Sequence, residues 1–377
     1  MIKAGILGGG QLGRMLLQEA ANYPVLTHVM ENDEDCPAAN LCHHFVKGNI
    51  TRYEDVMQFG EGLDVLTIEI ENVNVDALFA LEAKGVKVIP SPAALQTIKN
   101  KILQKGFYQK HEIPTAPFKV LSDRSELKSH VDMFPAVHKL ATGGYDGKGV
   151  QIIRNAEDIA LGFDAPSVLE KMIPISKEIA ITVAVAQGGQ TAVYPPVEMV
   201  FDPTLNLLDF QLCPAAIPDK VLWKAEAMAI SVARNLGSAG LFAVEMFVDG
   251  DENVWVNETA PRVHNSGHHT IEAHYSSQFD MLWRIMLNYP LGNTAYIMPS
   301  IMVNILGANG YAGEARAEGL EDVLSIPNVF VHLYGKRETK PGRKMGHATV
   351  ISHERQELIH QANRIRTTLS IKGSKAI

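Results

Sequence analysis

Two glutamates lie in apolar segments that a short polar turn separates. Glu245 stands within residues 242–248, FAVEMFV, and Glu258 follows the segment VWVN at 254–257. Two strands joined by this turn would form a hairpin in which Glu245 faces position 256 and Glu258 lies one pleat away. Because a carboxylate buried without a partner is too costly to keep charged, the pair predicts a shared hard cation such as Mg²⁺, completed by phosphate oxygens. The flanking aromatic residues disfavour the alternative, a solvated hairpin face.

A glycine-rich segment, GGYDGKG at 143–149, lies between predicted strands and follows Lys139. Glycines allow such a loop to fold over a polyphosphate, and Lys139 and Lys148 would supply positive charge to it. The segment is not a Walker A loop, because Gly149 stands where Ser or Thr is required and no helix clearly follows. A plain hairpin turn explains the glycine spacing equally well.

A second glycine motif opens the chain. Gly8, Gly10 and Gly13 match G-x-G-x-x-G directly after a strand and at the start of a helix, where backbone N–H groups can bind an anion. A dinucleotide site also needs an acidic residue at the end of the second strand, but Met30 precedes Glu31 there. We therefore interpret the loop as a site for the phosphate of another ligand, with NAD(P) and a purely structural turn as alternatives.

Cationic side chains follow Glu258 in the segment PRVHNSGHHT at 261–270. Its histidines fit no zinc spacing, but beside a metal-phosphate site Arg262 and His264 are placed to stabilise an anionic intermediate. A later basic cluster is either a solvated loop or a clamp on a substrate phosphate; its members are Lys336, Lys340, Arg343 and Lys344.

The composition limits the class of protein. At 377 residues the chain exceeds the usual size of one hydrophobic core, so we expect two or three domains. A net charge of −8 without basic-aromatic stretches favours a small-molecule substrate over nucleic acid. Cys36, Cys42 and Cys213 form no C-x-x-C pair and indicate unpaired thiols in a reducing compartment. With neither a basic leader nor an apolar run of about 20 residues, we predict a cytoplasmic protein without a membrane span.

The order of predicted elements indicates an α/β part followed by an α+β part. Strands alternate with helices up to Pro90-Ser91-Pro92, which predicts a parallel sheet covered on both faces; the strands are 4–7, 27–30, 65–70 and 86–89. A polar helix at 92–112 then leads to an antiparallel sheet with strands at 136–139, 150–153, 168–170, 179–186, 190–194, 240–248 and 253–257. From about residue 290 we expect strands at 300–306, 329–334 and 347–352 and a charged helix at 353–369.

Three of these segments together carry a family resemblance. The GGGQLG start, the GGYDGKG loop and the segment from Asn257 to Thr270 resemble the N5-carboxyaminoimidazole ribonucleotide synthetases, which are ATP-grasp enzymes of purine biosynthesis. The resemblance extends from residue 1 to about residue 350. It implies a Rossmann-like pre-ATP-grasp domain at 1–95, an ATP-grasp region at 96–289 with a mobile lid at about 115–172, and a small β-rich C-terminal domain at 290–377.

The resemblance also implies a reaction. ATP and bicarbonate would give carboxyphosphate and ADP, and the carboxyl group would pass to the exocyclic amine of 5-aminoimidazole ribonucleotide. The implied cofactors are ATP and Mg²⁺, with Mn²⁺ as a substitute, and the implied assembly is a homodimer. Carboxyphosphate is an unstable mixed anhydride, so such a site must exclude water and stabilise spread negative charge.

Site residues follow position by position from the resemblance. Those implied for ATP are Lys101, Lys139, Gly144, Tyr145, Asp146, Gly147, Lys148, Gly149, Val150, Asn257 and Glu258, with Glu170, Lys171, Met172 and Ile173 as the adenine hinge and Glu178 for the ribose. Glu245 and Glu258 match the metal ligands. Arg262, His264 and Tyr145 would hold carboxyphosphate, and Asp146 would take the proton of the amine. The residues implied for the ribonucleotide are Gln11, Leu12, Glu69, Asn265, Lys336, Arg343 and Lys344.

Four positions depart from the family pattern and cluster at the predicted nucleotide pocket: Leu140, Val150, Met199 and Phe201. Two alternatives therefore stay open. One is a related ATP-grasp enzyme, the formate-dependent glycinamide ribonucleotide transformylase, although the HNSGH segment at 264–268 favours the carboxylating family. The other is a nucleotide-binding homologue without turnover.

Overall fold

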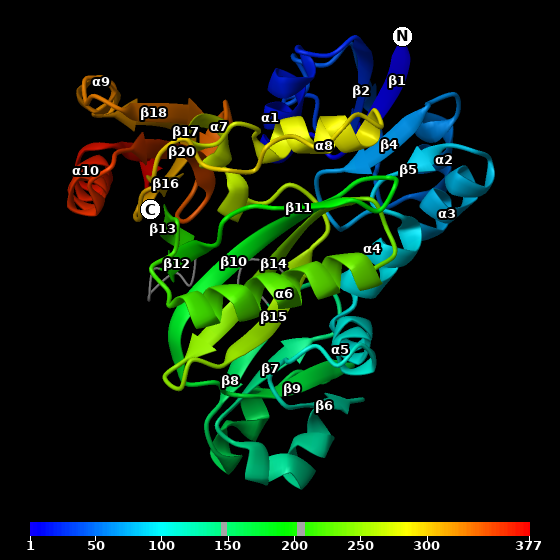
Figure 1. The fold of residues 1–377 in the computed structure, drawn as a ribbon, viewed down its shortest axis with the longest axis vertical. Coiled ribbons are helices and arrows are strands. Elements are labelled where there is room, and N and C mark those ends of the chain that lie inside the picture. Colours follow the sequence, from blue (N-terminus) through cyan, green and yellow to red (C-terminus); the bar gives the residue numbers. More distant parts are fainter. Residues whose placement is uncertain (145–148, 202–207) are drawn as a thin grey trace.

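A computed structural model describes residues 1–144, 149–201 and 208–377 and shows an elongated molecule (Figure 1). The N-terminal sheet and the C-terminal strands lie at one end of the long axis, and a small four-stranded sheet lies at the other end. A long central sheet connects the two ends, and helix α6 (Asp219–Asn235) crosses one of its faces.

The N-terminal sheet is entirely parallel, as the alternating order of elements predicted. Its strand order is β3-β2-β1-β4-β5. Helix α1 packs on one face, and α2 and α3 pack on the other, so each face of the sheet has its own apolar core. The elements are β1 (Ile2–Leu7), α1 (Gln11–Ala20), β2 (Val25–Glu31), β3 (His44–Lys47), α2 (Tyr53–Gly60), β4 (Val65–Ile68), α3 (Val75–Ala83) and β5 (Lys87–Val88).

The single helix predicted at 92–112 is wrong, because two helices occupy this stretch. They are α4 (Pro92–Lys99) and α5 (Lys101–Lys110), separated at Asn100. Asn100 has an extended backbone, and its side-chain oxygen accepts hydrogen bonds from the backbone N–H groups of Ile102 and Leu103. An asparagine that caps the second helix in this way cannot also continue the first. The break places Lys101 in the first turn of α5.

The four-stranded sheet contains the residues predicted to form a lid. It is antiparallel with the order β6-β9-β7-β8, and two 3₁₀ segments pack beneath it (Figure 1). Its strands are β6 (Phe118–Leu121), β7 (Ala136–Leu140), β8 (Val150–Ile153) and β9 (Ser167–Lys171), and the 3₁₀ segments are Arg124–Met133 and Ala156–Leu161.

The central sheet is antiparallel and joins the middle of the chain to its C-terminal part. Its strand order is β15-β14-β10-β12-β13-β16-β20-β18, with β11 paired to β10. The middle of the chain supplies β10 (Ile175–Val185), β11 (Thr191–Val193), β12 (Val197–Phe201), β13 (Leu208–Cys213), β14 (Gly240–Asp249) and β15 (Val254–Ala260). The C-terminal part supplies β16 (Ser300–Leu306), β18 (Val329–Leu333) and β20 (Lys344–Ile351). The two parts thus share one hydrogen-bonded sheet, and the domain boundaries remain a prediction.

The remaining elements cover this sheet. The sequence did not predict α6, whose apolar side packs against β10 and β14. Between β15 and β16 the chain forms a 3₁₀ turn at Asn265–Gly267, then α7 (Thr270–Ala273) and α8 (Gln278–Met286). A three-stranded sheet of β19 (Glu338–Thr339), β17 (Tyr311–Glu318) and β21 (Ser370–Ala376), with helices α9 (Leu320–Leu324) and α10 (Arg355–Thr368), completes the C-terminal part.

The three cysteines are unpaired thiols, as predicted: Cys36 and Cys213 are buried and Cys42 is half-buried. None of the helices among the described residues combines the length and the apolar character that crossing a bilayer requires.

Helix α8 is fixed to the N-terminal sheet through Trp283. Its indole is fully buried in the core shared by α1 and α8, and its N–H donates to the carbonyl oxygen of Leu16 at 2.7 Å. We expect Trp283→Ala to lower the free energy of unfolding by about 3–5 kcal/mol, because it leaves a large cavity and removes the indole hydrogen bond. Trp223→Ala is the matched control: this tryptophan lies on α6 and is 68% exposed, so its loss should change the value by less than about 0.5 kcal/mol. Urea unfolding followed by circular dichroism measures both, and equal effects would contradict the packing described.

Candidate functional site

The two glutamates face each other directly across the hairpin of β14 and β15. Met246 pairs with Val256, but Glu245 pairs with Glu258, so Asn257 is an extra residue in β15 that forms a bulge. The prediction that Glu258 lies one pleat away is therefore wrong. Bulges depend on how the ladder hydrogen bonds close and shift the register by one residue. The shift places both carboxylates on the same face of the sheet.

Their ionisation differs because their surroundings differ. Burial, followed by the nearby charge of Glu258, raises the pKa of Glu245. The ammonium of Lys101, whose Nζ donates to Glu258 Oε2 at 2.6 Å, lowers the pKa of Glu258 despite its partial burial. In the absence of a cation the pair therefore favours one proton and one charge. A hard divalent cation would fit in place of that proton, with two carboxylate oxygens as ligands.

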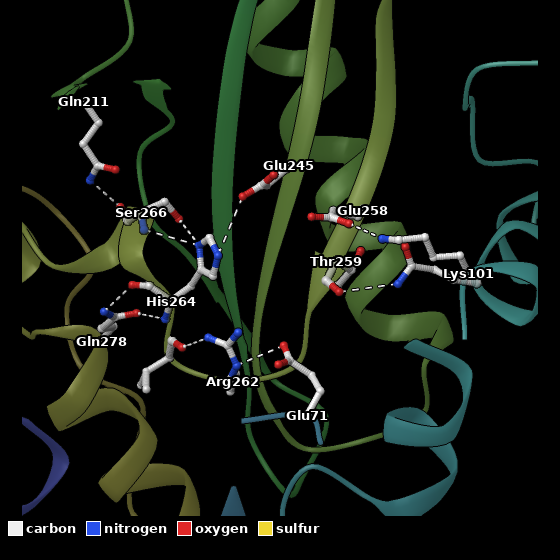
Figure 2. A network of polar contacts seen from close by, with 12 residues as sticks. Glu71, Lys101, Gln211, Glu245, Glu258, Thr259, Arg262, His264, Ser266 and Gln278 are labelled. Atoms are coloured by element: carbon white, nitrogen blue, oxygen red, sulfur yellow. Dashed lines mark hydrogen bonds and ion pairs between the residues drawn. The ribbon is translucent and has the colours of Figure 1, made fainter. Parts of the chain in front are cut away.

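Two lysines approach the hairpin from different elements. Lys101 comes from the start of α5 and contacts Glu258 (Figure 2). Lys139 comes from β7 and donates to Asn257 Oδ1 at 2.9 Å. The bulge residue Asn257 thus binds Lys139, and its neighbour Glu258 binds Lys101. Both lysines are predicted to bind ATP. The lid sheet and α5 are brought to the same strand.

A third lysine was missed by sequence reasoning. Lys105 looks like part of the solvated face of a polar helix, but its side chain is only 2% exposed and Nζ lies 2.9 Å from Glu170 Oε2. Glu170 is equally buried, and its other oxygen lies 3.1 Å from Lys139 Nζ. Burial opposes the ionisation of Glu170, but the two lysines outweigh it and lower its pKa. No signal in the sequence distinguishes this lysine from its exposed neighbours.

Arg262 and His264 lie in the loop that follows β15, next to the glutamates (Figure 2). Arg262 Nε is 2.9 Å from Glu71 Oε1, and its Nη1 donates to the carbonyl oxygen of Val263. His264 Nε2 is 3.7 Å from Glu245 Oε1. The loop thus adds a guanidinium and an imidazole beside the carboxylate pair.

A buried glutamine holds His264 on both sides of its backbone. Gln278 Oε1 accepts from the N–H of His264, and Gln278 Nε2 donates to the His264 carbonyl, each at 2.8 Å. The ring is oriented by Ser266, whose hydroxyl is 2.9 Å from Nδ1. Sequence reasoning missed Gln278 because it stands eight residues beyond the recognised motif, where nothing marks it as a partner.

Two cavities meet at the carboxylate pair. The first, of about 400 Å³, is lined by many of the residues predicted for the ribonucleotide and for carboxyphosphate: Gln11, Leu12, Glu69, Arg262, His264, Asn265 and Lys344. The second, of about 390 Å³, is lined by residues predicted for ATP: Lys101, Lys139, Val150, Glu170, Lys171, Met172, Ile173, Glu178, Asn257 and Glu258. Among the described residues, six line both cavities: Lys101, Glu245, Glu258, His264, Asn265 and Lys344. Glu245 and Glu258 therefore belong to a wall that the two cavities share.

The second cavity is lined by both polar and apolar side chains. The polar ones are mainly lysines and carboxylates. Apolar side chains form the remainder, including Val150, Met199 and Phe201, three of the positions that depart from the family pattern. The fourth, Leu140, lines the first cavity. Burial raises the pKa of Glu178, which lies at this cavity, to about 7. These walls suit a flat heterocycle attached to a phosphorylated sugar.

Several predicted residues lie elsewhere. Lys336 Nζ donates to the carbonyl oxygen of Lys344, and Arg343 Nη1 donates to the carbonyl oxygen of Glu338; among the described residues that line the two cavities, neither occurs. Gly144 lines the first cavity instead of the nucleotide side, and Gly149 lines neither. Tyr145, Asp146, Gly147 and Lys148 lie outside the described residues.

The absence of side chains at Gly8 and Gly10 leaves room for the carboxylate of Glu69 against the first glycine loop. Glu69 Oε2 accepts from the N–H of Gly13 at 2.7 Å. A side chain at Gly8 or Gly10 would collide with that of Glu69, and Gly8 has a φ of +104°. Burial raises the pKa of Glu69, although the backbone donors partly oppose the shift. One N–H predicted to bind a phosphate is thus already occupied, and the phosphate role of the loop remains a prediction.

A second group of metal-ligand types lies nearby in Cys213, His269 and His274, whose ligand atoms approach within 4.8 Å. Gln211 Nε2 donates to the Ser266 carbonyl and lies 2.9 Å from His269 Nδ1, so this nitrogen accepts from the amide. The ring proton of His269 is therefore on Nε2, which then offers no lone pair to a metal. We assign no metal to this group.

Known families match most of the chain. An ATP-grasp domain matches residues 106–279, a ribonucleotide synthetase preATP-grasp domain matches 1–99, and a phosphoribosylaminoimidazole carboxylase C-terminal domain matches 300–361. The N5-carboxyaminoimidazole ribonucleotide synthase of Synechococcus elongatus is 33% identical, over 92% of this chain and 88% of that protein. The phosphoribosylaminoimidazole carboxylase of Ogataea methanolica is 36% identical over 92% of this chain, but this chain spans only 66% of its length.

Solved structures agree in fold. The N5-carboxyaminoimidazole ribonucleotide synthetase of Thermotoga maritima superposes with a TM-score of 0.90 at 37% identity, covering 99% of this chain and 100% of that one. An N5-carboxyaminoimidazole synthase of Aspergillus clavatus, in complex with ADP and 5-aminoimidazole ribonucleotide, gives 0.89 at 34% identity, covering 97% and 98%. The fold and the resemblance predicted from the sequence are thereby confirmed: the chain belongs to the N5-carboxyaminoimidazole ribonucleotide synthetase family of ATP-grasp ligases.

Proposed function

We propose that this chain carboxylates 5-aminoimidazole ribonucleotide on its exocyclic amine, using ATP and bicarbonate and releasing ADP and phosphate. The observation that carries the proposal is the wall shared by the two cavities, which contains Glu245, Glu258 and His264. One cavity has the character of a nucleotide site and the other contains the residues matched to the ribonucleotide. A group activated on one side therefore reaches the other without leaving the protein.

The nucleotide half of the reaction belongs to the second cavity. Lys101 and Lys139 bind phosphate oxygens, and the apolar walls hold the base. Glu245 and Glu258 bind Mg²⁺, which when bound neutralises the phosphate charge that develops during transfer. Bicarbonate oxygen attacks the γ-phosphorus, ADP leaves, and carboxyphosphate forms. The protein supplies position and charge, so an activated serine or cysteine is unnecessary.

The second half takes place against the loop after β15. Arg262 and His264 stabilise the carboxyphosphate anion from the first cavity. The amine nitrogen attacks the carboxyl carbon, phosphate leaves, and the amine loses a proton. Tyr145 and Asp146 keep their predicted roles in this step, as anion donor and proton acceptor. The complex of the Aspergillus clavatus relative with ADP and 5-aminoimidazole ribonucleotide supports the same pair of ligands for this chain.

The other predictions keep their original basis. A homodimer rests on the family resemblance, and a cytoplasmic location rests on the three unpaired cysteines. We retain the three proposed domains, 1–95, 96–289 and 290–377, with the lid at about 115–172.

ADP release by the purified protein tests the reaction. With Mg²⁺, ATP and bicarbonate, we expect ADP formation to accelerate when 5-aminoimidazole ribonucleotide is added, because the acceptor removes carboxyphosphate. Formate is the control substrate. Formate-dependent turnover that ignores bicarbonate would replace this proposal with the transformylase, and no turnover in any mixture would support a binding protein.

The metal assignment predicts a large effect of one substitution. Glu258→Gln should reduce ATP cleavage by at least about 100-fold, because it removes a metal ligand and the partner of Lys101. Binding of Mn²⁺ in the presence of ADP, followed by electron paramagnetic resonance, should weaken in parallel. Glu252→Gln, in the turn of the same hairpin, is the matched control and should leave both measurements unchanged. Normal Mn²⁺ binding by the Glu258 variant would show that the metal lies elsewhere.

The Gln278 clamp predicts a loss of turnover at constant nucleotide affinity. Gln278→Leu removes both hydrogen bonds to the His264 backbone, and a displacement of about 1 Å at a reacting group can cost about 100-fold in rate. We therefore expect kcat to fall 10- to 100-fold while the dissociation constant of ADP, measured by calorimetry, changes little. Gln18→Leu on the exposed face of α1 controls for the added leucine. An unchanged kcat in the Gln278 variant would remove His264 from the mechanism.

A further inference from the structure

Lys105 is almost fully buried, so its ammonium group must be stabilised by polar partners within the protein. Its Nζ donates to Thr115 Oγ1 at 2.6 Å and lies 2.9 Å from Glu170 Oε2, and the Thr115 hydroxyl donates in turn to the carbonyl oxygen of Val256. Val256 immediately precedes Asn257 and Glu258, which bind Lys139 and Lys101. Three consecutive residues of β15 are thus each linked to a different lysine.

The charges around Glu170 do not balance. One buried carboxylate is shared by two ammonium groups, those of Lys105 and Lys139, so the three side chains carry one net positive charge. Only Lys139 of these two lysines lines the second cavity. Because Lys105 is enclosed by protein, the excess charge is available to a ligand only through Lys139. Without Lys105, the charge of Glu170 would neutralise that of Lys139, and the remaining pair would offer no net positive charge to a ligand.

We propose that Lys105 is a positioning residue for nucleotide binding, which shares the charge of Glu170 and thereby leaves the Lys139 ammonium available to the nucleotide phosphates. This inference rests on the proposed role of Lys139 in ATP binding. Lys105 itself touches no substrate. It acts through Glu170. Its bond to Thr115, which in turn bonds to Val256, fixes Lys105 and Glu170 relative to the hairpin of β14 and β15.

Charge compensation distinguishes this role from a merely structural one. Lys105→Met should raise the dissociation constant of Mg-ADP at least about tenfold, the effect of weakening one charge-assisted contact. The double variant Lys105→Met with Glu170→Gln removes one positive and one negative charge. It leaves the group of three side chains with the net positive charge of the wild type, now on Lys139 alone, and should recover most of that affinity. A structural role predicts the opposite order, since the second substitution would add to the damage. Lys110→Met, exposed at the end of the same helix, is the matched control and should bind as the wild type does.

The pH dependence of the Lys105 effect gives a further readout. Burial lowers the pKa of Lys105 to about 8, while the nearby Glu170 opposes that shift and Lys139 and Lys101 add to it. The ring of Tyr108 also lies against Lys105, and burial raises the pKa of its hydroxyl, so it stays neutral. Below pH 8 Lys105 is charged and shares Glu170; above pH 8 it is neutral and Lys139 pairs with Glu170 alone. The ratio of wild-type to Lys105→Met affinity for Mg-ADP should therefore fall as the pH rises through about 8. Both proteins contain Glu245, whose pKa burial also raises, so its titration cancels in this ratio.

Calorimetry from pH 6.5 to 9 measures these effects, with 5-aminoimidazole ribonucleotide binding and the melting temperature as checks of folding. The ratio of wild-type to Lys105→Met affinity should be at least about tenfold at the acid end of this range and approach one at the alkaline end. If the single variant does not fold, the ratio of wild-type to double-variant affinity decides, and it should fall from near one as the pH rises. A single variant with normal Mg-ADP affinity at the acid end, a double variant no better than the single, or ratios that do not change with pH would each overturn the inference. Absence of Mg-ADP binding by the wild type would instead overturn the proposed function.

Discussion

The repulsion between Glu245 and Glu258 is the constraint on which the site depends. The bulge at Asn257 places the two carboxylates directly opposite each other, on one face of the sheet and partly out of water. Such a pair cannot remain doubly charged without cations close by. The structure brings three lysines and a histidine from four different segments: Lys101 from α5, Lys139 from the lid sheet, His264 from the loop after β15, and Lys344 from β20.

This convergence explains why the chain is built from three parts that share a wall. A carboxylate pair on a single hairpin could attract a cation without help. It could not recruit lysines from a lid sheet and from a C-terminal strand unless the central sheet extended to both. The antiparallel sheet that runs from β15 to β18 provides that frame, while the bonds to Val256, Asn257 and Glu258 tie α5 and the lid sheet to its edge.

The sequence predicted those features that depend on local patterns. The parallel N-terminal sheet followed from the order of elements, and the glutamate pair followed from charged residues in apolar strands. The bulge was not predictable, because register is set by hydrogen bonds that close across the hairpin. Lys105 and Gln278 were missed for a related reason. Nothing in a lysine on a polar helix indicates that Glu170, 65 residues further along the chain, will enclose it.

Helix α6 and the break at Asn100 were missed for different reasons. Helix α6 is amphipathic, but it lies between two strand-rich stretches, and no element is predicted there. Asn100 was read as part of one continuous polar helix, although an asparagine followed by helix formers is also an N-cap signal. The distinction has a functional consequence, because capping by Asn100 directs Lys101 toward Glu258.

The division of labour between the two cavities follows from the instability of the proposed intermediate. A mixed anhydride of bicarbonate and phosphate survives only if water is excluded and its charge is met by groups already in place. Six residues already face both cavities, so an anion made at one side is stabilised by the same charges when it is consumed at the other. Neither half of the reaction then needs the protein to build a new charged surface between steps. The carboxylate pair that predicts a metal site thus also lies where the two proposed substrates must meet.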